Sequence, residues 1–146
     1  MDRLKWVPKG WGGESWIVNK PEYCGKLLFF KKGFHCSMHR HKLKEETFFC
    51  RTGKLLVVHS EEDCVVDGKV AIESYCPPKY LSRERHWLDA TLDGVPTATM
   101  TVLEPGDVFH VPIGLHHAML GLLDTELFEF STEHFDSDSI RTLKGD

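Results

Sequence analysis

Six of the nine histidines in this sequence lie in two short groups. The first group consists of His35, His39 and His41, and the second consists of His110, His116 and His117. Neutral imidazole is the commonest side-chain ligand of divalent transition metals. The two groups therefore predict a metal site, on the condition that the fold brings them together.

The first group belongs to the segment Gly33–Gly53, which reads GFHCSMHRHKLKEETFFCRTG. Residues two apart on a β-strand point to the same side, so His39 and His41 can share one cation. A turn predicted at Lys42–Glu45 separates them from Glu46, which begins the next strand. This turn would bring the carboxylate of Glu46 back toward the two imidazoles.

The second group belongs to GDVFHVPIGLHH, where Pro112 and Gly114 predict a turn and His117 begins the strand after it. Three imidazoles and one carboxylate, with coordination positions left open, suit Mn, Fe, Zn, Co or Ni in the divalent state. We therefore expect one divalent metal ion as the cofactor. Its predicted ligands are His39, His41, Glu46 and His117.

The elements that must position these ligands read as β-strands. Helical periodicity is hard to find, whereas short alternating or apolar runs bounded by Gly, Pro and Asp recur, which predicts an all-β sandwich or barrel. The predicted strands include 26–31, 36–41, 47–51, 54–60, 70–74, 98–103, 107–112, 117–120 and 126–131. The Asp67-Gly68 and Asp93-Gly94 pairs each predict a type I′ hairpin. Residues 1–25 are expected to wrap the outside, and the polar residues after Ser131 to be irregular.

The two histidine segments resemble the paired motifs of the cupin superfamily. The first motif, G(x)5HxH(x)3-4E(x)6G, is matched by Gly33, His39, His41, Glu46 and Gly53. The second motif, G(x)5PxG(x)2H(x)3N, is matched by Gly106, Pro112, Gly114 and His117, with Gly121 in place of the final Asn. The resemblance implies a double-stranded β-helix, a jelly-roll barrel with the metal inside one end. A barrel that no longer uses a metal is the alternative, but an unpaired glutamate is costly inside a barrel.

By the same resemblance, residues 1–146 form a single cupin domain that pairs as a homodimer. Residues 61–97, which lie between the motifs, look like an insertion carrying the two hairpins. Arg83 and Arg85 lie in this insertion and would bind an anionic substrate as part of a lid. The alternative is a solvated loop anchored by Trp87.

Two further histidines have weaker claims to the site. His116 neighbours His117, and adjacent strand residues face opposite ways, so we expect it to be exposed and not to ligate. His110 either lines the pocket or is an ordinary strand residue.

Three segments resemble small sugar-pathway cupins of the mannose-6-phosphate isomerase and D-lyxose isomerase type. They are WGGESWIVNKPEYCGKLLFF, the HxHxxKxE run at 39–46, and FEFSTEHFDSDSIR at 128–141. The resemblance implies aldose–ketose isomerisation of a sugar or sugar phosphate, in which a divalent metal polarises the carbonyl and stabilises an enediolate. The candidate bases are Glu129, Lys44 and His110.

Two other functions remain open at this stage. Iron-dependent cupin dioxygenases use the same three histidines and a glutamate, although Glu46 argues against a thiol dioxygenase, which resembles a variant lacking that acid. A non-catalytic carbohydrate-binding or regulatory cupin is the second alternative.

Composition excludes other classes of protein. The chain has 146 residues and a formal charge of −4 without a block of like charge, so we expect one domain and no nucleic-acid partner. No apolar run approaches the roughly 20 residues of a membrane span, and we expect no transmembrane helix or signal peptide. The five cysteines include no CxxC pair, which favours free, mostly buried thiols in the cytoplasm.

Overall fold

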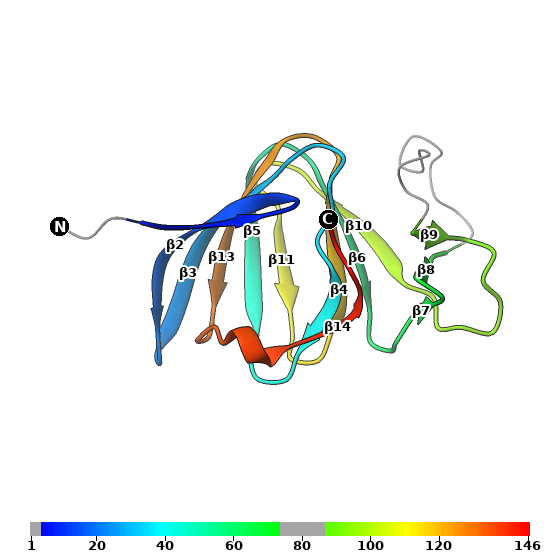
Figure 1. The fold of residues 1–146 in the computed structure, drawn as a ribbon. Helices are drawn as coiled ribbons and strands as arrows, with labels where there is room; N and C mark the ends of the chain where they lie inside the picture. The colour runs from blue at the N-terminus through cyan, green and yellow to red at the C-terminus, as the bar shows by residue number, and fades with distance from the viewer. Residues whose placement is uncertain (1–3, 74–86) are drawn as a thin grey trace.

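Two antiparallel sheets face each other in the computed structural model, which describes residues 4–73 and 87–146 (Figure 1). The six-stranded sheet has the spatial order β1 (Lys5–Lys9), β2 (Gly12–Lys20), β3 (Tyr23–Phe30), β13 (Thr125–Ser131), β5 (Glu46–Thr52) and β11 (Val108–Val111). The five-stranded sheet has the order β10 (Thr99–Leu103), β6 (Leu55–Ser60), β12 (His116–Gly121), β4 (Met38–His41) and β14 (Ser139–Leu143). This pair of facing sheets confirms the predicted all-β jelly-roll barrel.

Alternation along the strands decides which side chains enter the barrel. Strand β3 shows it clearly, because Cys24, Lys26, Leu28 and Phe30 are buried while the residues between them are more exposed. Apolar side chains from both sheets fill much of the interior, including Trp11, Leu28, Phe30, Phe48, Val57, Val111 and Leu127. The remaining inward-facing positions are polar and form the candidate site.

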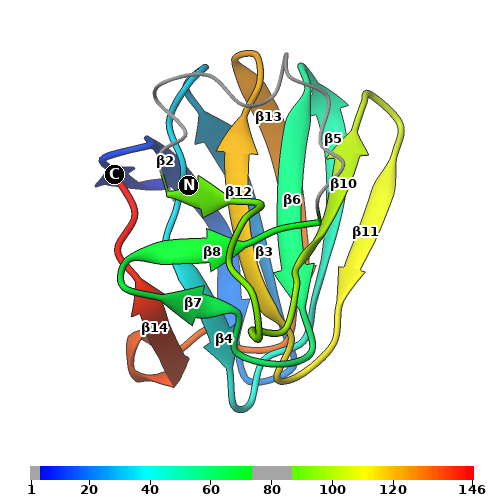
Figure 2. The same ribbon diagram turned by 90° about the vertical axis from the view of Figure 1, so that its right-hand side faces the viewer.

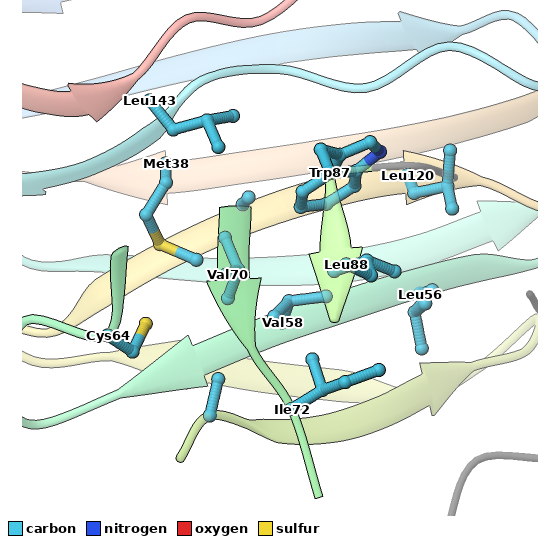
Figure 3. Close-up of a cluster of buried hydrophobic side chains, with 12 residues drawn as sticks. Met38, Leu56, Val58, Cys64, Val70, Ile72, Trp87, Leu88, Leu120 and Leu143 are labelled. Carbon is cyan, nitrogen blue, oxygen red and sulfur yellow. The ribbon is translucent and has the colours of Figure 1, made fainter. Parts of the chain in front are cut away.

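The 61–97 region adds a small third sheet, which consists of β7 (Val65–Val66), β8 (Lys69–Ala71) and β9 (Leu88–Asp89). It lies against the outer face of the five-stranded sheet (Figure 2). A second apolar cluster joins the two, with Met38, Leu56, Val58 and Leu120 on one side and Cys64, Val70, Trp87 and Leu88 on the other (Figure 3). Trp87 is 3% exposed and is buried in this cluster, as the alternative of a loop anchored by this residue expects.

One of the two predicted hairpins forms. Asp67 and Gly68 have φ values of 49° and 75° and connect β7 to β8, as a type I′ turn requires. The prediction for Asp93-Gly94 was wrong, because the described residues on its two sides do not pair with each other. Leu88–Asp89 instead pairs with β8, and Ala98 forms a bridge to Ile72.

Both ends of the described chain are more regular than the sequence indicated. Residues 5–20 form β1 and β2, which extend the six-stranded sheet at one edge. The tail after Ser131 was expected to be irregular, and this was wrong: it forms the 3-10 helix η3 (Asp136–Asp138) and then β14, which pairs with β4. The tail ends near the β1–β2 turn, since a Cβ on Gly10 would lie 2.1 Å from the carbonyl carbon of Asp146 (Figure 1, Figure 2).

The structure explains why Gly121 stands where the cupin motif has Asn. A Cβ at this position would lie 2.7 Å from the Lys31 carbonyl oxygen and 3.1 Å from that of Leu123. Backbone on both sides leaves no room for a side chain. The motif glycines have a different reason: Gly33, Gly53, Gly106 and Gly114 all adopt positive φ, between 87° and 96°.

The four cysteines in the described part of the chain are free and buried, as predicted: Cys24, Cys36, Cys50 and Cys64. Burial raises the pKa of the Cys36 thiol to about 12. Within the described residues, no helix is long and apolar enough to cross a membrane.

Candidate metal centre

The three predicted histidine ligands meet inside the barrel. His39 and His41 alternate along β4, and His117 lies directly opposite His39 on the neighbouring strand β12. Residues paired in this way point to the same side of a sheet. One potential ligand atom from each ring lies within 4.8 Å of the other two, which confirms that the fold brings the two motifs together.

The imidazole rings of His39 and His117 are oriented by hydrogen bonds at Nδ1, the nitrogen that points away from the cluster. Nδ1 of His39 lies 2.9 Å from the Ser37 carbonyl oxygen, and Nδ1 of His117 lies 3.0 Å from that of Leu115. A carbonyl oxygen only accepts, so Nδ1 carries the hydrogen and Nε2 is left with its lone pair. Burial, followed by the charges of His117 and His41, lowers the pKa of His39 well below its ordinary value, which keeps this ring neutral.

Glu46, the fourth predicted ligand, lies beside two of the three histidines and is not part of the group within 4.8 Å that the three rings form. Its Oε2 atom lies 3.4 Å from Nε2 of His41 and 3.2 Å from Nε2 of His117. All three atoms are buried, and none has a hydrogen-bond partner among the residues that the structure describes. Burial by itself would raise the pKa of Glu46, but contacts with His117 and His41 and the Lys44 charge hold it well below its ordinary value.

The three buried atoms without hydrogen-bond partners indicate whether these residues fit a metal ion. Oε2 of Glu46 and the Nε2 atoms of His41 and His117 lie together in a buried position without hydrogen-bond partners in the described structure, and a bound cation would satisfy all three. The donor set of nitrogen and oxygen suits a divalent transition metal. The residues therefore fit the predicted metal site, although they do not select one metal.

A residue that the sequence analysis missed supports the third imidazole. Asp138 Oδ2 lies 3.7 Å from Nδ1 of His41, and Ser139 Oγ lies 3.5 Å from the same atom. Asp138 Oδ1 also accepts hydrogen bonds of 2.9 Å from the backbone N–H groups of Lys42 and Leu43. The carboxylate thus holds both the ligand and the turn between the ligand strands. No local signal in its polar segment indicated this contact.

Lys44 links the ligand set to Glu129. Its Nζ atom lies 3.0 Å from Oε1 of Glu46 and 3.3 Å from Oε2 of Glu129, and all three side chains are at most 5% exposed. Burial would lower the pKa of Lys44, but the two carboxylates raise it above its ordinary value. Burial, and then the charge of Glu46, raises the pKa of Glu129. Two predicted candidates for the base thus lie beside the metal centre.

A second polar group lies beyond Glu129 and was not predicted. Lys26 lies opposite Glu129 in the strand register, is 1% exposed, and forms a 3.3 Å ion pair with Glu14. Lys44 also donates to Nδ1 of His134 over 3.0 Å. Burial, and then the charges of Lys44 and Lys26, lower the pKa of His134 to about 4, so this ring is neutral near pH 7.

The metal ligands and this polar group line one cavity of about 400 Å³. Apolar side chains from both sheets form part of its wall: Trp11, Leu28, Phe48 and Met119. The cavity is large enough for a small molecule and small enough to enclose most of one.

Other predicted residues are placed elsewhere. His110 lies on β11 with a side chain that is 53% exposed, contacts Thr47, and does not line the cavity. His116 was expected to be exposed, and this was wrong: it is 8% exposed, because the small sheet covers that face of β12. It does not join the ligand group, as predicted. Arg83 and Arg85 lie outside the described residues.

A jelly-roll barrel with three histidines gathered inside it, and a glutamate beside two of them, defines a cupin-fold protein with a candidate metal centre. No protein-family model and no curated protein matches the sequence. Solved structures do match. The capsular polysaccharide assembling protein CapF from Staphylococcus aureus is 16% identical, with a TM-score of 0.66 over 97% of this chain and 34% of CapF.

Two other solved cupin-fold structures agree. KdgF from Halomonas sp. is 14% identical, with a TM-score of 0.60 over 91% of both chains. Oxalate decarboxylase from Bacillus subtilis is 14% identical, with a TM-score of 0.63 over 95% of this chain and 30% of that one. This chain therefore spans about a third of the length of CapF and of the decarboxylase. At these identities the likeness establishes the fold and carries no activity over.

Proposed function

We propose that this protein is a metal-dependent isomerase that interconverts the aldose and ketose forms of a sugar or sugar phosphate. The observation that carries the proposal is the position of Glu129. Its carboxylate is buried in the same cavity as the three histidines, and one lysine side chain separates it from the ligand Glu46. CapF, by its description a capsular polysaccharide assembling protein, supports a carbohydrate substrate.

Isomerisation needs a base that moves a proton from the hydroxyl-bearing carbon beside the carbonyl to the carbonyl carbon, while the hydroxyl proton passes to the former carbonyl oxygen. A bound divalent cation would supply a Lewis acid that polarises the carbonyl oxygen. Glu129 would accept and return the proton through its carboxylate. Its surroundings suit this role, because an ionised carboxylate shielded from water is a stronger base than one at the surface.

Lys44 would position both carboxylates, that of Glu46 as a metal ligand and that of Glu129 as the base. It contacts one oxygen of Glu46, which leaves Oε2 of that residue for the metal, and it contacts Oε2 of Glu129. Ser131 Oγ donates to the same Glu129 oxygen over 3.0 Å. These contacts fix the carboxylate of Glu129, and a positioned base is more effective than a free one.

The test is turnover of pentoses, hexoses and their phosphates by metal-loaded protein under argon. Glu129→Gln should retain its metal and lose activity by about 10²–10⁴-fold, which is the usual contribution of a general base. Glu126→Gln is the matched control, because Glu126 lies on the same strand but pairs with Arg51 outside the cavity. Unchanged turnover in Glu129→Gln would contradict the proposed base.

The same experiment separates the alternatives. Oxygen uptake that requires iron, without anaerobic turnover, would indicate a dioxygenase. Saturable sugar binding without turnover in either condition would indicate a binding protein.

A further inference from the structure

The mouth of the cavity carries an arginine that none of the steps above uses. Arg141 lies on β14 directly opposite His39 on β4. Directly paired residues point to the same side of a sheet, and both side chains line the cavity. His39 is also the one ligand of the three histidines that is partly exposed. The guanidinium therefore lies at the side from which a substrate reaches the metal centre.

Arg141 has no ion pair or side-chain hydrogen bond with any residue that the structure describes. The two acidic side chains at the mouth have other partners. Asp136 accepts a 2.9 Å hydrogen bond from Nε2 of His134, and Asp146 accepts one of 2.7 Å from the backbone N–H of His35. The cation is therefore free to bind a ligand.

The balance of charge at the mouth of the cavity favours an anion. Deep in the cavity, Lys26 and Lys44 face three glutamates, and the buried carboxylate of Asp138 lies behind His41. A divalent cation would offset the two excess negative charges. At the mouth, three cationic side chains outnumber two carboxylate side chains; the five residues are Lys9, Arg141, Lys144, Asp136 and Asp146. The entrance is therefore the part of a metal-loaded cavity in which positive side chains are in excess.

We infer that Arg141 binds the acidic group of an acidic sugar, a carboxylate or a phosphate, while the sugar's oxygens face the metal centre. A guanidinium binds either group through two parallel hydrogen bonds, which a neutral hydroxyl does not offer. The inference rests on the proposed isomerase and narrows its substrates to sugars with an anionic group. It places anion recognition on the barrel itself, in addition to any role of Arg83 and Arg85.

The test compares the affinities of matched ligands for the metal-loaded protein by calorimetry. The panel contains uronates, sugar phosphates and the corresponding neutral sugars. Acidic sugars should bind at least about tenfold more tightly than their neutral counterparts, which corresponds to about 1.4 kcal/mol. The preference should weaken as salt is added, because the mouth is open to solvent. Whether uronates or phosphates bind better identifies which acid the site prefers.

Arg141→Gln should remove this preference and leave the affinity for neutral sugars and the metal content unchanged. Arg141→Lys should restore part of it, since the charge returns without the paired hydrogen bonds. Arg40→Gln is the matched control, because Arg40 is on the adjacent strand but faces the other side of the sheet.

The inference is overturned if no acidic sugar binds more tightly than its neutral partner. It is also overturned if Arg141→Gln weakens both kinds of ligand equally. Its failure is distinguishable from that of the isomerase. Anion preference that depends on Arg141 without any turnover contradicts only the activity, whereas turnover of neutral sugars with no anion preference contradicts only the role of Arg141.

Discussion

The carboxylate of Asp138 lies 3.7 Å from Nδ1 of His41, at the end of the imidazole opposite the metal centre. Carboxylates in this position orient a ligating histidine and increase its basicity. The Asp138 carboxylate also accepts hydrogen bonds from the backbone N–H groups of Lys42, Leu43 and Lys44. One buried side chain from the C-terminal part of the fold therefore fixes the geometry of a motif that lies almost a hundred residues earlier.

Asp138→Asn should weaken metal binding by about 10–100-fold, because it removes the charge behind His41. Competition with a chelator measures the affinity. Asp136→Asn is the control, since that residue belongs to the same short helix but has a side chain that is 92% exposed. Equal metal affinity in the two variants would show that Asp138 is not part of the metal centre.

His39→Ala and His117→Ala should each lose bound metal while the barrel stays folded. The apolar interior that holds the sheets together does not include these side chains. Elemental analysis gives the metal content and circular dichroism the fold. His59→Ala should keep its metal, because His59 pairs with His117 in register but bonds to Thr101 instead. Full occupancy in the first two variants would rule out this ligand set.

Lys44→Met should destabilise the metal-free protein by about 3–5 kcal/mol, as expected when one member of a buried ion pair is removed. The loss leaves the carboxylates of Glu46 and Glu129 without their shared cation. Adding Glu129→Gln should recover part of the stability. Chemical denaturation measures both effects, and Lys42→Met, on the exposed side of the same turn, should be close to neutral. The decisive result is a double variant that is more stable than the sum of the two single changes predicts. If the two changes in unfolding free energy simply add, Lys44 and Glu129 do not interact.

Gly121→Asn should destabilise the fold by about 1–3 kcal/mol or more, although it restores the residue found in the cupin motif. The new side chain would meet the backbone oxygen of Lys31. Gly68→Asn is the comparison: nothing lies within 4 Å of its Cβ position, and its φ of 75° is one that asparagine adopts more readily than most other residues. Thermal unfolding of the two variants compares them directly, and a neutral Gly121→Asn would contradict the close approach.

No described thiol should react quickly with a disulfide reagent at pH 8 in the folded protein. Burial raises the pKa of Cys36 to about 12 and that of Cys64 to about 11, so the reactive thiolate is scarce. The measurement is best made in a Cys76→Ser background, since Cys76 lies outside the described residues. Unfolding should then expose four reactive thiols, and a fast thiol before unfolding would point to a nucleophilic cysteine.

Much of the ligand set could be predicted because its determinants are local. Alternation on one strand aligns His39 with His41, and a short turn returns Glu46 to them. The motif glycines mark turns with positive φ, such as Gly53 at 91°. The strands themselves were largely predictable, since alternating burial leaves its period in the sequence.

Errors arose where a segment's structure depends on a distant partner. Asp93-Gly94 has hairpin residues, but its neighbours pair with β8 and Ile72 instead. The residues after Ser131 are polar, but β14 forms because β4 offers an open edge. His116 does face outward from the barrel, as its strand position predicts, but the small sheet covers this face and buries the side chain.

The sequence by itself determined the four candidate metal ligands, the turns that bring them together and the β class of the fold. Only the tertiary structure decided which other charged groups share the cavity. Glu129 and His110 are both polar residues on strands whose side chains alternate between the two faces. Glu129 nevertheless faces the metal centre, whereas His110 faces solvent. The difference arises because strand register between distant segments, such as Glu129 with Lys26 and Arg141 with His39, sets which face of each strand is enclosed.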